Sequence, residues 1–414
     1  MKLSFRRKKK GSPFPQVSHT KGYYRFSKDF PSVTDSEGYR DNDLIINSPA
    51  KKTSVRRKLI LLFICVFVIS FAGTALCISL SALPIKDAHE QASDSTAQSV
   101  TLTGSKAAFL KGDVLSSQGI ESILGAFRTE NINAVVIEFK DAEGFFYFRP
   151  SIRTSAEAVS KASDNAQKVI NEFRDAGIKV YASVSCFADD IYARNHQDHT
   201  AYVISEPESG SNEKVRSIWY AGENGENAWL SPFSDEVLYY LNTVISDIDA
   251  LGVDGIILAN AVIPLSAEND NVKFEFAALY EETAREKTAQ WIEYTLASVT
   301  TDTGIEISQA QLLEYAGKTK TDPALTAGCD FIVLDAGISD AKDGTVIGNK
   351  QYLAPAKTPV EYTQALLTLA VGFFSQNEAD IQIIPVIDDD GNAGTLASAA
   401  AQLNNDKINF CIVK

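Results

Sequence analysis

Along the last three quarters of the chain, short apolar runs alternate with segments of helical periodicity. The runs are five to eight residues long and rich in Val and Ile, as expected for strands buried on both faces of a parallel sheet. Eight runs fit this description, at residues 106–110, 133–139, 178–185, 253–259, 304–308, 329–335, 381–387 and 408–413. The pattern therefore predicts eight buried strands.

Helical patterns fill the segments between these runs. The clearest are 117–130, 156–176 and 234–251. In the last of these, Ser234 is a good N-cap, acidic residues occupy the first turn, and Gly252 ends the helix. The other helical segments are 272–299, 309–317 and 359–375. Strand and helix in alternation, repeated to eight strands, predict an α/β fold of the (β/α)8 or TIM-barrel type. An open doubly wound sheet is the alternative.

Two connections are longer than a barrel requires. Residues 186–233 follow the third predicted strand, and residues 260–271 follow the fourth. Both insertions therefore lie at the carboxyl ends of strands, which is the face where barrel enzymes build their active sites. We expect functional residues in these insertions and at the ends of the strands.

Residues 59–85 contain no charged side chain, and their first half is apolar on all sides. Because about 20 apolar residues in a helix cross the bilayer core, residues 59–83 are predicted to form one transmembrane helix. Basic residues crowd its amino-terminal side at 51–58, which places the N-terminus in the cytoplasm and the C-terminal domain outside the cell. The alternative is a cleaved signal peptide, which would have a shorter apolar core and a much shorter preceding tail.

The charge of the chain changes sign at this apolar segment. Residues 1–58 carry 15 Lys or Arg and 5 Asp or Glu, whereas the rest of the chain carries 24 and 48. The basic tail 1–58 is predicted to be disordered and cytoplasmic, residues 84–104 to form a flexible stalk, and residues 105–414 to form one extracellular domain. We expect a single-pass protein of the cell membrane. Its acidic exterior argues against nucleic acid as a partner.

Cysteine and histidine spacing indicates neither a cofactor nor a metal site. Cys186, Cys329 and Cys411 stand alone in apolar strand contexts, so they are predicted to be buried free thiols. His196 and His199 are three residues apart, but no other His lies near them. The acidic turn 388–392 could hold calcium through oxygen ligands, but it lacks the full spaced loop and is more typical of a plain turn.

Residues 133–148, NAVVIEFKDAEGFFYF, resemble the second strand of a bacterial family of glycosyl-hydrolase barrels of unknown function, whose pattern is NAVVIDVKD followed by Gly. Residues 177–189, 228–232 and 252–256 continue the resemblance, which weakens after residue 265. The resemblance implies a TIM barrel related to glycoside hydrolases that acts on carbohydrate outside the cell. Its chemistry would require two carboxyl groups that flank the glycosidic bond.

The sequence departs from this family at the fourth strand. The family reads FDEIQFDYIRFP, whereas this chain reads VDGIILANAVIP, so Ala259 replaces the second Asp and Val262 replaces the Arg. Neither replacement can take up a proton or stabilise a developing charge. Asp388 ends a Pro-Val-Ile-Asp run where the family has Pro-Trp-Leu-Gln. These changes predict a catalytically degenerate barrel.

The remaining candidates are polar or aromatic residues at strand ends and in the insertions. The candidate catalytic residues are Asp141, Asp189 and Asp335, and the candidate substrate-binding residues are Lys140, Trp219, Trp229, Asn260 and Asp388. Each also has a structural interpretation. The charged residues could form a salt-bridged turn or a helix cap, and the tryptophans could pin the long insertion onto the barrel.

Three functions are compatible with the sequence. The first is a membrane-anchored, catalytically degenerate barrel that binds cell-wall or surface glycan, or an envelope protein. The second is an active glycoside hydrolase that uses Asp141, Asp189 and Asp335. The third is a structural or assembly protein of the cell envelope. Fold alone does not decide between them.

Overall fold

The computed structural model describes residues 18–20, 23–25, 105–205, 214–221, 227–269, 271–317, 322–338, 341–377, 381–387 and 410–413. The predicted transmembrane helix 59–83 and stalk 84–104 lie outside these ranges. Within the predicted tail, β1 (Ser18–Thr20) and β2 (Tyr23–Arg25) pair as an antiparallel hairpin. In the ranges that the structure describes, no helix has both the length and the apolar character needed to cross a membrane.

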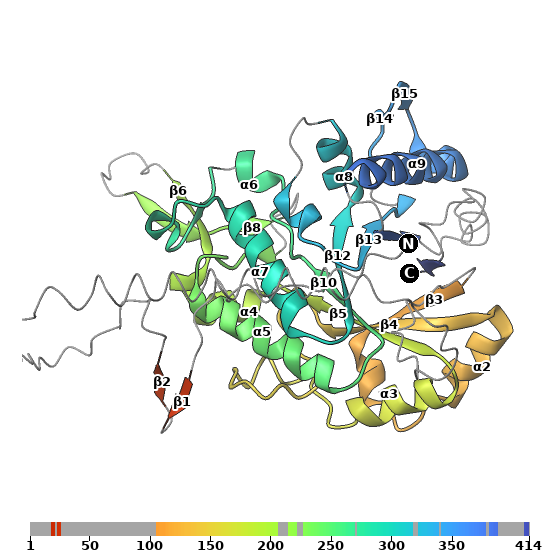
Figure 1. Cartoon of the computed structure of the whole chain (residues 1–414), viewed down its shortest axis with the longest axis horizontal. Coiled ribbons are helices and arrows are strands. Elements are labelled where there is room, and N and C mark those ends of the chain that lie inside the picture. The colour runs from red at the N-terminus through yellow and green to blue at the C-terminus, as the bar shows by residue number, and fades with distance from the viewer. Residues whose placement is uncertain are drawn as a thin grey trace, which may run out of the picture. The chain divides into compact units, whose positions relative to one another are not determined.

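Eight parallel strands form a closed barrel with helices around it (Figure 1). In chain order the strands are β3 (Ser105–Leu110), β4 (Ile132–Lys140), β5 (Lys179–Ser185), β10 (Gly255–Ala259), β12 (Asp302–Ser308), β13 (Phe331–Asp335), β16 (Gln382–Ile387) and β17 (Phe410–Val413). Each strand pairs with the next, and β17 pairs with β3. The eight predicted strands are confirmed, and the alternative of an open sheet is wrong.

The helices that follow these strands all end within about two residues of the predicted boundaries, and four of them also begin near their predicted starts. They are α2 (Glu121–Glu130), α3 (Ala166–Asp175), α5 (Asp235–Ala250), α7 (Ala284–Ser298), α8 (Gln309–Ala316) and α9 (Pro359–Asn377). In α5 the Ser234 side chain accepts the Val237 backbone N–H, and Gly252 follows the helix with a φ of +72°. Both predicted ends of this helix are therefore confirmed.

Two predicted helices begin later than their sequence pattern indicated. Residues 156–165 form turns, because their backbone pairs with the segment after β4: Phe146 N–H donates to Ala158 O, and Ser163 N–H donates to Tyr147 O. Residues 272–282 are also not α-helical, although Ala277–Leu279 form one short 3-10 turn. They include β11 (Lys273–Phe274), which pairs with the insertion, and α7 starts only at the Thr283–Glu286 capping box. Tertiary pairing overrides local helix propensity in both places.

The insertion after β5 builds small antiparallel sheets. Strand β6 (Ala201–Ser205) pairs with β7 (Val215–Ile218) on one side and with β11 on the other, and β8 (Tyr220–Ala221) pairs with β9 (Asn227–Ala228). Short helices α4 (Asp190–Asn195) and α6 (Ser266–Asn269) lie within the insertions after β5 and β10, and a hairpin of β14 (Thr345–Ile347) and β15 (Lys350–Tyr352) follows β13. All of these elements follow the carboxyl ends of barrel strands.

The hydrophobic core has two parts, which lie on the two faces of the barrel sheet. The larger part packs between the strands and the surrounding helices. The smaller part includes Ala134, Val136, Ile257, Val333 and Ile384, which alternate with residues of the larger part along their strands. Because side chains alternate between the faces of a strand, the smaller part fills the barrel interior.

Two glycines make room for aromatic rings at the amino-terminal end of this interior. Gly255 pairs in register with Tyr181, and Gly304 pairs with Phe331. A Cβ on Gly304 would lie 2.2 Å from the Phe331 ring, and a Cβ on Gly255 would lie 2.4 Å from the Tyr181 ring. The two rings meet edge to face with centroids 6.2 Å apart. This end of the barrel is therefore plugged by side chains.

Replacing Gly304 by Ala should lower the free energy of unfolding by about 1–3 kcal/mol, because the new methyl group overpacks the Phe331 ring. Gly372→Ala on α9 is the matched control, because a Cβ there meets no atom within 4 Å. The control should be neutral or stabilising by up to about 1 kcal/mol. Urea unfolding followed by circular dichroism measures both, and equal stabilities would contradict the proposed tight packing.

Candidate functional site

A pocket of about 580 Å³ opens at the carboxyl ends of β10, β12 and β13. We call it the mouth pocket. It brings together three residues that the sequence analysis selected, Trp229, Asn260 and Asp335, with Glu306 and Lys342. The insertion after β5 contributes Trp229, and the connections after β10 and β13 contribute other parts of the wall. This is the face on which a barrel builds its site.

Two carboxyl groups share the mouth pocket. Glu306 lies between Ile305 and Ile307, which pack on the outside of the barrel, so its half-buried side chain points inward. In the register Glu306 pairs with Val333, two residues before Asp335. Strand spacing then puts the Cα atoms of Glu306 and Asp335 about 8 Å apart. Two flexible carboxylates with this spacing can approach a ligand from one side of the mouth.

Sequence analysis did not select Glu306, although a signal for it was present. In the fifth strand, GIEIS, an acidic residue stands at an alternating position between two Ile residues. In a strand with one face toward a barrel interior, such a residue near the carboxyl end is typical of the mouth. Lys342, in the loop after β13, also lines the pocket and carried no comparable signal.

Asn260 and Asp335 are positioned by local hydrogen bonds. Asn260 has a φ of +50°, which turns the chain away at the end of β10, and its side-chain amide donates to Ser185 Oγ at 3.0 Å. The Asp335 carboxylate accepts the backbone N–H of Gly337 at 3.1 Å and remains half-buried. Trp229 is only 2% exposed, so the insertion holds its ring firmly against the barrel.

The rim of the mouth at β10 is apolar. Ala259 is 8% exposed and Val262 is 2% exposed, and Val262 lines the mouth pocket. Of the two replaced positions, Val262 forms part of the pocket wall and Ala259 is buried at the end of β10. They supply neither a carboxylate nor a guanidinium group at this edge.

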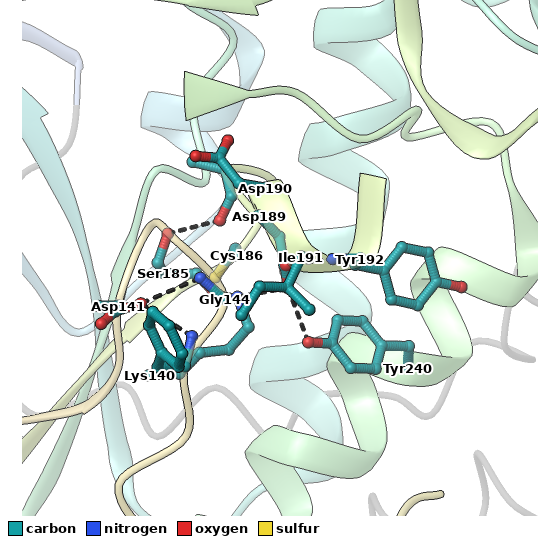
Figure 2. A network of polar contacts seen from close by, with 12 residues as sticks. Lys140, Asp141, Gly144, Ser185, Cys186, Asp189, Asp190, Ile191, Tyr192 and Tyr240 are labelled. Carbon is teal, nitrogen blue, oxygen red and sulfur yellow. Dashed lines mark hydrogen bonds and ion pairs between the residues drawn. The ribbon is translucent and has the colours of Figure 1, made fainter. Parts of the chain in front are cut away.

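Lys140 and Asp189 form an ion pair that is closed to solvent (Figure 2). Lys140 Nζ lies 2.9 Å from Asp189 Oδ2, and the two side chains are 0% and 1% exposed. The ammonium group also donates to Ser185 O at 2.9 Å, and Tyr240 OH donates to Asp189 Oδ2 at 2.8 Å. Asp189 Oδ1 accepts the Tyr192 backbone N–H at 2.7 Å, which caps α4. These contacts tie the ends of β4 and β5 to α4 and α5.

Gly144 fits closely against this ion pair. Its φ is +98°, and a Cβ at this position would lie 2.1 Å from Asp189 Oδ1. A residue with a side chain would therefore be strained and would also collide with the carboxylate. The Gly in the sequence after Lys140 and Asp141 is required by the packing of the loop against Asp189.

Asp141 organises the same loop from its other end. Its Oδ1 accepts the backbone N–H groups of Gly144 and Phe145 at 3.0 and 2.9 Å. Its Oδ2 accepts the Tyr147 hydroxyl at 3.0 Å and lies 3.7 Å from Lys161 Nζ. The structure places Asp141, Asp189 and Lys140 in structural networks outside the lining of the mouth pocket.

Glu138 is a second acidic residue that the sequence analysis did not select. It stands at the Asp of the quoted NAVVIDVKD pattern, two residues after Val136, which faces the barrel interior. Burial raises the pKa of its carboxyl group, and Lys111, 3.8 Å away, opposes this effect. Glu138 therefore adds a carboxyl group near the end of β4. In the closed barrel β4 is four strands away from β13, which carries Asp335, so the two residues lie on opposite sides of the barrel.

Trp219 and Asp388 are the remaining selected residues, and only Trp219 lies among the described ones, outside the lining of the mouth pocket. Trp219 is 4% exposed and packs in the outer core, with its backbone bonded to Ala201 and Trp229. Asp388 lies outside the described residues. Among the residues that the structure describes, no group of three or more His, Cys, Asp or Glu side chains could hold a metal ion.

Asp189→Ala should lower the free energy of unfolding by about 3–5 kcal/mol, because it leaves the buried Lys140 ammonium without a counter-ion. Asp164→Ala is the control. It breaks the Arg149 ion pair, whose side chains are 57% and 78% exposed, and should cost less than about 1 kcal/mol. Denaturant unfolding measures both variants. Similar losses of unfolding free energy would show that the buried pair stabilises the fold no more than the exposed pair does.

Cys186 should resist alkylation in the folded protein. Burial raises the pKa of its thiol to about 12, so the reactive thiolate is absent at neutral pH. Peptide mapping after iodoacetamide treatment should find Cys186 unmodified in native protein at pH 8 and modified in denaturant. Rapid native labelling would mean that the segment after β5 opens.

Comparison with known proteins finds a family for this chain. A family model described as "putative glycosyl hydrolase domain" matches residues 107–324, which is more than half of the chain. No curated protein matches. A hypothetical protein from Ruminiclostridium thermocellum ATCC 27405 is 18% identical, with a TM-score of 0.36, over 47% of this chain and 96% of that chain.

Two named glycoside hydrolases are also structurally similar. Alpha-L-fucosidase isoenzyme 2 from Paenibacillus thiaminolyticus is 11% identical, with a TM-score of 0.45, over 75% of this chain and 46% of that chain. The glycoside hydrolase domain of PelA from Pseudomonas aeruginosa is 9% identical, with a TM-score of 0.40, over 75% and 94%. The match to the family model confirms the resemblance seen in the sequence, and the chain belongs to this family of glycosyl-hydrolase-like domains.

Proposed function

We propose that this protein is a membrane-anchored barrel that binds cell-wall or surface glycan in its mouth pocket, outside the cell. The observation that carries the proposal is the composition of the pocket. An aromatic ring, amides, hydroxyls and two carboxylates converge in about 580 Å³, which is a volume typical of small-ligand sites. Sugars present apolar faces and many hydroxyl groups, so this mixture suits them.

The anchor and the location rest on the sequence. The apolar segment 59–83, with its basic amino-terminal flank, supports a single helix with the barrel outside. A membrane-bound barrel with an acidic exterior would meet extracellular polymers first. An envelope protein that occupies the same pocket is the other partner compatible with this arrangement.

Binding without cleavage is supported by the apolar rim at β10. Ala259 and Val262 supply no proton and no positive charge where the family pattern has Asp and Arg. Val262 therefore offers a ligand only an apolar surface, and Asn260 beside it offers an amide that can form hydrogen bonds.

Hydrolysis is the second candidate, because Glu306 and Asp335 share the mouth pocket. Glycosidases require two carboxyl groups, about 5 Å apart for retention and about 6.5–9.5 Å apart for inversion. The register of β12 and β13 allows both ranges. This pair replaces the combination of Asp141, Asp189 and Asp335, two of which are engaged in structural networks.

Binding can be tested with the full chain in detergent micelles on an array of bacterial surface glycans. Asn260→Ala and Glu306→Gln should each weaken binding to the best glycan by about 5- to 100-fold, as expected for the loss of a hydrogen bond to a neutral or charged group. Asn171→Ala, on the exposed face of α3, is the matched control and should bind normally. Absence of glycan binding by the unaltered chain would refute the proposal.

The same glycan then distinguishes binding from cleavage. If the second candidate is correct, released reducing ends will accumulate, and Glu306→Gln and Asp335→Asn will each lower kcat by at least about 100-fold. Asp141→Asn should retain most of the activity, because Asp141 lies outside the pocket. If the bound glycan stays intact over days, the hydrolysis candidate is refuted and only the binding function remains.

A further inference from the structure

A second pocket, of about 680 Å³, lies on the flank of the barrel and shares no lining residue with the mouth pocket. We call it the flank pocket. Its walls come from the loop after β4, from α4, and from the first two turns of α5. Gly144 and Asp189 lie at one side of it, Thr154 and Ser155 at another, and Glu236 at the start of α5.

The aromatic wall of the flank pocket is held in place from several sides. The Tyr192 ring lies between His196 and Tyr240, with centroid distances of 4.3 and 4.6 Å. The Tyr240 hydroxyl is fixed by Asp189, and the Tyr192 hydroxyl lies 3.4 Å from Glu236 Oε1. Tyr239 lines the pocket beside them and is half-buried. A ligand would therefore meet a preformed surface and would not have to order it.

The charges around the flank pocket nearly cancel. Asp189 is neutralised by Lys140 at 2.9 Å. Asp235 interacts electrostatically with Lys287, which is on the neighbouring helix α7. Arg153 and Glu236 contribute opposite charges. The pocket consequently has no excess charge that would select an anion or a cation.

A neutral ligand with both an apolar face and several hydroxyl groups fits this lining. Tyr239 and Ile152 provide apolar contact, while Thr154, Asn195, Arg153 and Glu236 provide donors and acceptors. The volume lies within the range of small-ligand sites. We propose that the flank pocket is a second carbohydrate-binding site, which takes a neutral sugar unit of an oligosaccharide. It shares its ligand class with the proposed function but uses different residues.

Two pocket-filling variants separate the sites. Ser266→Trp obstructs the mouth pocket, and Thr154→Trp obstructs the flank pocket. The full chain in detergent micelles is titrated with cellotetraose, chitotetraose and maltotetraose, and binding is followed by saturation-transfer NMR. At least one sugar should still bind the Ser266→Trp variant. Adding Thr154→Trp should weaken that binding at least 10-fold.

Controls keep the two proposals distinct. Thr129→Trp, at an exposed site on α2, should leave binding unchanged, and circular dichroism checks the fold of every variant. Glu236→Gln, which keeps the size of the side chain, should weaken flank binding about 3- to 10-fold if Thr154→Trp fails to fold.

If Ser266→Trp abolishes all binding, the flank site is refuted and the mouth site stands. If Thr154→Trp alone abolishes binding, the flank site stands and these sugars do not occupy the mouth, which the glycan array tests separately. If none of the three sugars binds the unaltered chain, the flank proposal fails for neutral sugars, while the glycan array still tests the mouth.

Discussion

The buried contact between Lys140 and Asp189 holds the functional face of this barrel together. Taking two charges out of water costs several kcal/mol for each ion, and only close geometry with further hydrogen bonds offsets that cost. Here the Asp189 carboxylate also accepts hydrogen bonds from the Tyr240 hydroxyl and from the backbone N–H of Tyr192. The Lys140 ammonium group also donates to the backbone carbonyl of Ser185. One interaction thus fixes two strand ends, one short helix and one long helix, and the flank pocket is built on the two helices and on the loop after β4.

The barrel could be predicted from the sequence because its strands are buried on both faces and therefore read as continuous apolar runs. All eight strands occur within about two residues of their predicted bounds. Helix starts were less predictable. The segments 156–165 and 272–282 contain good helix formers, but the first pairs with the loop after β4 and the second pairs with β6. Such pairing depends on tertiary neighbours that local sequence does not reveal.

The site was only partly predictable, for a related reason. Asp141, Asp189 and Asp335 all lie at or shortly after the carboxyl end of a strand, and nothing in the local sequence distinguishes them. They differ in the contacts of their carboxylates. Asp141 and Asp189 accept backbone N–H groups of the residues that follow them, whereas Asp335 lines the mouth pocket. Glu306 was missed because it lies within a strand, where an acidic side chain is unexpected until the strand is known to border an open interior.

The close approach of Gly144 to Asp189 has a consequence for how the flank pocket can vary. Any residue other than glycine at this point would displace the carboxylate and with it the support of Lys140. Thr154 and Ser155, further along the same segment, line the flank pocket away from this close contact. Substitutions at Thr154 and Ser155 could therefore change which ligand the flank pocket prefers. The wall formed by Gly144 beside the Lys140–Asp189 ion pair must keep its glycine.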